Sequence, residues 1–338
     1  MSAVRTTRAA ARVIVAAAFL ASHVQPAFAY LHYGVPANGT TVTLKWTQTP
    51  RYYVNAQTAV DGVSNADFQA TVAKAFATWD AVPTSVLSHQ FAGLTSAEPG
   101  VDDGISVLGF EMQADLDRVL ASTDYVVDEV TGQLLESDIF FNSAYPWSIA
   151  ANGESGKYDL QSIALHETGH FSGLGHSALG ETTLLPDGGR QVISAEAVMF
   201  PIAYPAGSIA ARTLKADDIA GISDLYPGAA AASFGSISGH VTANGAGVFG
   251  AHVVAIDAAT GQMVGGFSLD AKGDFSIGAL SPGPHLLRVE PLDDADLDSF
   301  FSNPSAVDVN FQVAFVDRVI IVPSGADSGI VSIAVVAK

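Results

Sequence analysis

Hydrophobic residues recur at two different spacings, which divide the chain into strands and helices. Apolar runs rich in β-branched and aromatic residues predict strands at residues 41–46, 51–55, 104–110, 124–128 and 134–142. Thr131 and Gly132 supply turn residues between the last two runs. We therefore expect these two strands to form a hairpin.

Three segments repeat their apolar residues every three or four positions, as helices do. The first covers residues 65–82, with Asn65 as the expected N-cap, and the second covers residues 158–176. The third covers residues 214–228, where Asp217 and Asp218 would lie near the positive end of the helix dipole.

The pattern changes after residue 228. Residues 229–235 are small and uncharged, which is typical of a linker. Short apolar runs separated by turn residues then continue to the end of the chain and predict a β-sandwich of about seven or eight strands. His240 and His252 lie in these predicted strands and are expected to be structural.

Residues 1–29 have the pattern of a secretory signal peptide. Three arginines precede an apolar run at residues 13–21, and Ala27 and Ala29 suit a signal peptidase that cleaves after Ala29. The run is too short for a membrane anchor, which needs about 20 apolar residues. No other segment is long and apolar enough to span a bilayer. We expect a secreted protein, extracellular or periplasmic, with no membrane span.

Composition narrows the classes of function. The chain has 338 residues, of which 49% are apolar and 14% charged, which is globular and long enough for two domains. It has 34 acidic and 15 basic residues. Removing the signal peptide would take away three arginines and leave a formal charge of −22. Such a surface repels phosphate backbones, so nucleic acid is not an expected partner. The chain has no cysteine, so disulfides do not stabilise it.

The segment HETGHFSGLGH, residues 166–176, has the spacing of a metal site. In a helix His166 and His170 lie on one face and can offer two nitrogens to one ion. Gly173 can adopt the left-handed conformation that ends a helix, which would bring His176 round as a third ligand. Three neutral nitrogens fit zinc and leave a fourth position open, as in catalytic sites.

Glu167 stands beside the first of these ligands and would act as the general base. Zinc would lower the pKa of a water in the open position, and Glu167 would accept its proton as the water attacks a peptide carbonyl. Three alternatives remain: a surface cluster of histidines, a zinc-binding adhesion protein with little turnover, and a zinc hydrolase that acts on non-protein substrates.

The same segment matches HExxHxxGxxH, the signature of the metzincins, and AVMFP resembles their Met-turn, with Met199 beneath the zinc ligands. Five segments between residues 42 and 227, two of which contain this signature and the Met-turn, are similar to matrixins and their bacterial relatives. The resemblance implies an α+β domain with a twisted, mostly parallel sheet and three helices. It also implies zinc-dependent endopeptidase activity on a polypeptide that pairs antiparallel with a sheet edge above the metal.

The resemblance assigns Pro201 and Tyr204 to the substrate pocket, although Tyr204 lies one residue beyond the usual spacing. Vertebrate matrixins hold a second, structural zinc through upstream histidines, but no histidine lies between His89 and His166. We therefore expect one zinc. Relatives also bind calcium in acidic loops, so Ca²⁺ is a second expected ion, although no loop here has a recognisable ligand pattern. Lys215 stands where matrixins have a Ser or Thr helix cap.

Residues 236–292 resemble the carboxypeptidase regulatory-like β-sandwich, a non-catalytic module of secreted enzymes. This resemblance implies that the C-terminal part attaches the enzyme to a surface or shields an edge of the catalytic domain. The expected organisation is a signal peptide at 1–29, a metallopeptidase domain at 30–228, a linker at 229–235 and a sandwich at 236–338.

Overall fold

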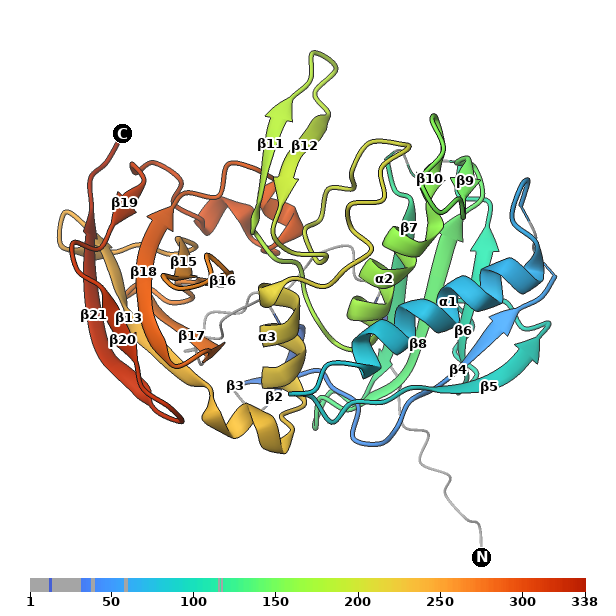
Figure 1. The fold of residues 1–338 in the computed structure, drawn as a ribbon, viewed down its shortest axis with the longest axis horizontal. Coiled ribbons are helices and arrows are strands. Elements are labelled where there is room, and N and C mark those ends of the chain that lie inside the picture. The colour runs from blue at the N-terminus through green and yellow to red at the C-terminus, as the bar shows by residue number, and fades with distance from the viewer. Residues whose placement is uncertain (1–11, 14–31, 38–39, 58–59, 115, 117) are drawn as a thin grey trace, which may run out of the picture.

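The structure, a computed structural model, describes residues 12–13, 32–37, 40–57, 60–114, 116 and 118–338. An α+β part is followed by a β-rich part, and the two lie side by side (Figure 1). Apart from Arg12–Val13, the predicted signal peptide lies outside the described residues. In the described part of the chain, no helix combines the length and the apolar character needed to cross a membrane.

Five strands form the main sheet of the first part. Their spatial order is β7 (Ala121–Val127), β8 (Leu134–Asn142), β6 (Ser106–Glu111), β4 (Arg51–Asn55) and β5 (Gln90–Thr95). The pairs from β8 to β5 are parallel, whereas β7 and β8 form the predicted antiparallel hairpin. A two-residue strand, β1 (Arg12–Val13), pairs antiparallel with the other side of β7. The predicted mostly parallel sheet is confirmed.

Three helices accompany the sheet: α1 (Asn65–Asp80), α2 (Leu160–Phe171) and α3 (Ala216–Leu225). Three two-stranded ribbons complete this part: β2 (Gly34–Ala37) with β3 (Thr40–Thr43), β9 (Trp147–Ser148) with β10 (Tyr158–Asp159), and β11 (Gly180–Leu184) with β12 (Arg190–Ala195). The β11–β12 ribbon projects from the body of the molecule (Figure 1).

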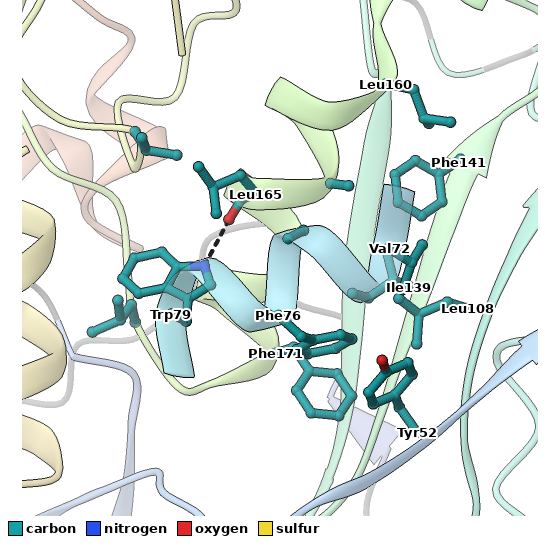
Figure 2. Close-up of a cluster of buried hydrophobic side chains, with 14 of the residues drawn as sticks. Tyr52, Val72, Phe76, Trp79, Leu108, Ile139, Phe141, Leu160, Leu165 and Phe171 are labelled. Carbon is teal, nitrogen blue, oxygen red and sulfur yellow. Dashed lines mark hydrogen bonds between the residues drawn. The ribbon is translucent and has the colours of Figure 1, made fainter. Parts of the chain in front are cut away.

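Aromatic side chains hold α1 against α2 and the sheet. Phe76 of α1 stacks on Tyr52 of β4 with ring centroids 4.1 Å apart and meets Phe171 of α2 edge-on at 5.0 Å. The indole N–H of Trp79 donates to the Leu165 carbonyl at 3.0 Å, as Figure 2 shows. These side chains are almost completely buried, so the helix that carries the histidines is anchored by the core.

The N-cap predicted for α1 is wrong by one residue. Ser64 is the cap, and its hydroxyl accepts the Asp67 N–H at 3.2 Å. The Asn65 side chain instead donates to the Ala56 carbonyl, which ties the helix start to the end of β4. Ser and Asn cap helices equally well, so the sequence pattern does not separate the two positions.

The pattern also missed β5 and the two ribbons formed by β9 with β10 and by β11 with β12. β5 is an edge strand with no buried side chain, and its pairing with β4 skips Ala92. The strands of the β11–β12 ribbon are rich in polar residues, and buried positions do not alternate with exposed ones along them. Such segments become strands because of what they pair with, and hydrophobic periodicity carries no signal for that.

The C-terminal part consists of two sheets with an apolar core between them. One contains β13 (Gly235–Ala243), β14 (Ala246–Gly247), β17 (Asp274–Leu280) and β21 (Asp327–Val335). The other contains β15 (His252–Asp257), β16 (Met263–Phe267), β18 (Gly283–Glu290), β19 (Ala314–Phe315) and β20 (Ile320–Val322). Two short 3₁₀ turns, η2 (Leu297–Ser299) and η3 (Pro304–Ala306), lie between β18 and β19. The sequence predicts about seven or eight strands, and the described residues contain nine, of which β14 and β19 have two residues each.

The segment predicted as a linker has regular structure. Residues Ala229–Ser233 form a 3₁₀ helix, η1, and β13 begins at Gly235. Alanine favours helical backbone, so an alanine-rich stretch need not be an open linker.

The two parts share apolar clusters. Ala178, Val192, Ala195 and Phe200 of the first part pack with Phe267, Leu292, Ala295, Phe300, Phe301 and Val307 of the second. A smaller cluster joins Leu179 and Ala197 to Val254. Because both clusters contain buried side chains from both parts, the two parts pack directly against each other and are not separate domains joined by a linker alone.

Asp217 is a buried carboxyl group in this interface. It lies in the first turn of α3, and one of its oxygens accepts the Gly265 N–H of β16 at 2.8 Å. Burial raises its pKa to about 7, and this effect is opposed by hydrogen bonds from Ser177 and Gly265. The folded protein therefore binds a proton at Asp217 at pH values where the unfolded chain has lost it.

We predict that this carboxyl makes the protein less stable as the pH rises from about 4 to 7. A raised pKa in the folded state stabilises below the unfolded pKa, and the stabilisation is lost by up to about 1.4 kcal/mol per pH unit as Asp217 ionises. Asp217→Asn keeps an acceptor for Gly265 but does not ionise. Chemical denaturation should give similar stabilities at pH 4 and a more stable variant at pH 7. A variant with the pH profile of the unaltered protein would show that Asp217 is ionised throughout.

Candidate metal centre

The start of α2 is held by a buried carboxylate. Asp159 is the N-cap and accepts the Ser162 N–H at 2.9 Å and the Ser162 hydroxyl at 2.6 Å. The guanidinium of Arg212 pairs with both oxygens of Asp159, through Nε at 2.9 Å and through Nη2. This bidentate pair ties the helix start to the segment that precedes α3.

The end of α2 is a sharp turn that requires glycine. Gly173 has φ +96°, and the N–H groups of Gly173 and Leu174 bond to the carbonyls of His170 and Gly169. This is the Schellman arrangement, which reverses the chain and sends it towards His176. A Cβ at residue 173 would also lie 2.7 Å from the Leu44 carbonyl oxygen.

The last carbonyls of α2 accept hydrogen bonds from aromatic side chains instead of water. The hydroxyls of Tyr125 and Tyr226 donate to the carbonyls of His170 and Ser172, each at 2.7 Å. The indole N–H of Trp46 donates to the Phe171 carbonyl at 2.7 Å. Three buried or half-buried rings therefore hold the helix end without a single charge.

His166, His170 and His176 converge on one point. One ring nitrogen from each lies within 4.8 Å of the other two, and the ring centroids are 4.6, 4.7 and 5.4 Å apart. The Nε2 atoms of His170 and His176 are 3.2 Å apart. Among the described residues, no other group of three or more His, Cys, Asp or Glu side chains brings its ligand atoms this close.

Each imidazole is oriented by a backbone carbonyl. Nδ1 of His166 lies 2.8 Å from the Val198 oxygen, and Nδ1 of His170 lies 2.8 Å from the Leu174 oxygen. Nδ1 of His176 lies 2.8 Å from the oxygen of Ser299. Because a carbonyl only accepts, Nδ1 carries the proton in all three rings and the Nε2 lone pairs are left for an ion.

The three histidines are neutral at physiological pH. Burial and the neighbouring His176 lower the pKa of His166 to about 3, and burial also lowers the pKa of His170 and of His176. Two lone pairs 3.2 Å apart repel each other unless a cation lies between them. Three neutral imidazole nitrogens fit zinc, whereas calcium and magnesium prefer oxygen.

Glu167 lies on α2 between the first two histidines and is buried. The Thr123 hydroxyl of β7 donates to its Oε2 at 2.6 Å. Burial raises the pKa of Glu167 to about 7, and the Thr123 hydrogen bond opposes this. The carboxyl group of Glu167 is therefore held by strand β7.

Met199 is buried directly beneath α2. A Cβ added to Gly169 would lie 2.3 Å from the Met199 sulfur, so the helix and the methionine approach as closely as glycine allows. The Asp218 carboxylate holds this turn by accepting the N–H groups of Val198 at 2.9 Å and Met199 at 3.1 Å. It also accepts the N–H of Lys215 at 2.8 Å, whereas Lys215 itself makes no side-chain capping bond.

The two residues predicted for the substrate pocket are both half-buried. The Tyr204 hydroxyl accepts the Ala195 N–H of β12 at 2.9 Å, and its ring packs on the apolar cluster shared with the C-terminal part. Pro201 follows the Met-turn by two residues. Tyr204 is thus tied to the β11–β12 ribbon.

Two supporting residues were not foreseen from the sequence. Thr123 looks like an ordinary strand residue, and nothing in its neighbourhood in the sequence points to Glu167, 44 residues later. Asp218 carried a signal as an acidic residue near a helix start, but its bonds to the Met-turn, 19 and 20 residues earlier, depend on how α3 packs.

Comparison with known proteins assigns the first part of the chain. The sequence model of the matrixin family matches residues 45–227, which is more than half of the chain and includes α1, α2, α3 and all three converging histidines. A search among curated proteins found no match.

We predict that Gly173→Ala destabilises the fold and displaces His176. The left-handed φ costs an alanine about 1–2 kcal/mol, and the contact with the Leu44 carbonyl adds about 1–3 kcal/mol. The free energy of unfolding, measured with a denaturant, and the amount of zinc bound per protein should both fall.

Gly188 provides a matched control. Its φ is +80°, but a Cβ there would have no neighbour within 4 Å. Gly188→Ala should show the conformational cost alone and keep the metal. Equal losses in the two variants would mean that the Leu44 contact and the turn towards His176 contribute nothing.

Proposed function

The chain belongs to the matrixin family and contains a matrixin metalloendopeptidase domain, and we propose that it is a secreted zinc endopeptidase with Glu167 as its general base. His166, His170 and His176 would hold the zinc. The second part of the chain lies outside the family match. The convergence of three neutral, Nδ1-protonated imidazoles beside a buried carboxyl group carries this proposal.

Zinc, when bound, would supply a Lewis acid that polarises the scissile carbonyl and lowers the pKa of water. The chain's own residues do the rest. Glu167 accepts the proton of the attacking water and returns a proton to the departing amine. Thr123 holds the Glu167 carboxyl at the centre, since its hydroxyl lies 2.6 Å from Oε2. Met199 supports the histidines from below through its contact with Gly169.

The substrate would bind as an extended strand along β7. This strand is the outer strand of the five-stranded main sheet, and its Thr123 bonds to Glu167. An edge strand presents unpaired N–H and carbonyl groups to an incoming chain. Residues Arg12–Val13, within the predicted signal peptide, pair antiparallel with Tyr125 and Val126 on this edge. Cleavage after Ala29 would remove that pairing and open the edge to substrate.

The remaining assignments are also proposals. Pro201 and Tyr204 would border the pocket next to the scissile bond, with the β11–β12 ribbon beside them. The domain limits at 30–228 and 236–338, the regulatory-like nature of the sandwich and its attachment to a surface follow from the sequence. Calcium stays a prediction.

Metal removal tests the proposed function directly. We predict that the purified protein cleaves casein, that a chelator abolishes cleavage and that added zinc restores it. A zinc-binding adhesion protein would bind the ion without cleaving casein, and a hydrolase of other substrates would show chelator-sensitive turnover only on a non-peptide ester. Casein cleavage that survives complete zinc removal would contradict the proposal.

We predict that Glu167→Gln keeps the fold and the zinc but lowers kcat/KM by about 10²–10⁴, because the amide cannot accept the proton. Glu111→Gln is the control, since Glu111 is exposed at the end of β6. Zinc content and melting temperature should match in all three proteins. Normal turnover by Glu167→Gln would remove Glu167 from the role of base.

A further inference from the structure

The third histidine of the centre takes its orientation from the other half of the molecule. His166 and His170 bond to Val198 and Leu174, which lie within the matrixin match. His176 bonds instead to the carbonyl of Ser299, 2.8 Å from its Nδ1 and 123 residues further along the chain. Ser299 ends the short turn η2, in the C-terminal sandwich and outside the matched residues.

This carbonyl determines which nitrogen of His176 faces the centre. It can only accept, so it selects the ring form with a proton on Nδ1. The Nε2 lone pair then points to Nε2 of His170, 3.2 Å away. His176 lies beyond the end of α2, so the helix itself does not orient the ring as it orients His166 and His170.

The turn that carries Ser299 is itself well held. The Ser299 N–H donates to Asp296 at 2.9 Å, and the N–H groups of Phe300 and Phe301 donate to Leu297 at 3.1 and 2.9 Å. Both phenylalanines are buried in the cluster shared by the two parts. The ring of Phe300 lies 6.5 Å from that of His176, so the same residues pack beside the imidazole and hold the carbonyl.

The β11–β12 ribbon of the first part forms hydrogen bonds with residues 293 and 294, which precede η2. Nη1 of Arg190 donates to the Asp293 carbonyl at 2.9 Å. Thr182 donates its N–H to the Asp294 carboxylate at 2.8 Å and its hydroxyl to the Asp294 carbonyl at 2.6 Å. This ribbon lies between His176 and Met199 in the chain, so polar contacts and apolar packing both connect the centre to the sandwich.

We propose that the C-terminal sandwich is a working part of the metal centre, with the η2 turn as a positioning element for His176. Zinc affinity then depends on the docking of the sandwich, although the family signature lies wholly in the first part. This inference rests on the proposed function only in taking zinc as the ion.

Two variants of the full-length protein test it. Arg190→Ala removes the bonds that Arg190 makes to Asp293 and Asp296. Phe300→Ala removes a buried ring beside His176. The controls are Asp327→Ala, whose bonds to Ser236, Ser238 and Gly329 stay within the sandwich, and Phe315→Ala, whose ring is 62% exposed.

Zinc affinity is measured by competition with a chelator, and the visible spectrum of the Co²⁺-loaded protein reports the ligand geometry. We expect Arg190→Ala and Phe300→Ala to bind zinc about 10- to 100-fold more weakly, as loss of a partner of a ligating histidine does, with an altered Co²⁺ spectrum. Asp327→Ala and Phe315→Ala should bind as the unaltered protein does.

Wild-type affinity and an unchanged Co²⁺ spectrum in both test variants would overturn the inference, whatever their melting temperatures. If Phe300→Ala does not fold, the zinc affinity and Co²⁺ spectrum of Arg190→Ala still test the inference. Peptide cleavage is scored separately. If zinc affinity depends on docking but no peptide is cleaved, the proposed function is refuted and this inference stands. If peptide is cleaved but zinc affinity does not depend on docking, this inference alone is refuted.

Discussion

Three neutral imidazoles must be buried side by side with their lone pairs directed at one point, and the rest of the structure serves this arrangement. Neutral rings cannot be held by ion pairs, so each is oriented by a carbonyl oxygen 2.8 Å from its Nδ1. The three carbonyls belong to three distant segments: the Met-turn, the turn after α2 and the η2 turn of the sandwich. The centre therefore exists only when all three segments are in place.

The same requirement explains how α2 is held. α2 carries a half-buried histidine, a buried histidine and a buried glutamate, and its ends are stabilised by specific bonds. Asp159 and Arg212 hold its start, whereas the hydroxyls of Tyr125 and Tyr226 and the indole of Trp46 satisfy its last carbonyls. Asp218 accepts two N–H groups of the Met-turn and one at the start of α3. Polar groups that resemble ordinary cap or strand residues in the sequence thus hold α2 and the Met-turn in place.

The elements predicted from periodicity are those that bury a regular face. β4, β8, the three helices and the strands of the sandwich all appear, because apolar positions repeat with the period of the element. The N-cap of α1 was misplaced by one residue, since Ser64 and Asn65 are equally suitable. The β11–β12 ribbon was missed because its few buried residues, Val192 and Ala195, follow no strand periodicity. They pack against the sandwich, and the ribbon also bonds to Asp293 and Asp294.

The sequence by itself determined the local chemistry of the centre: two histidines one helical turn apart, a glutamate beside them, and a glycine whose backbone freedom reverses the chain towards a third. Those relations span eleven residues and follow from helix geometry. Only the tertiary structure decided what surrounds them. Thr123 on Glu167, Asp218 on the Met-turn and Ser299 on His176 join residues 19 to 123 positions apart, and such contacts depend on packing, which leaves no periodic trace in the sequence.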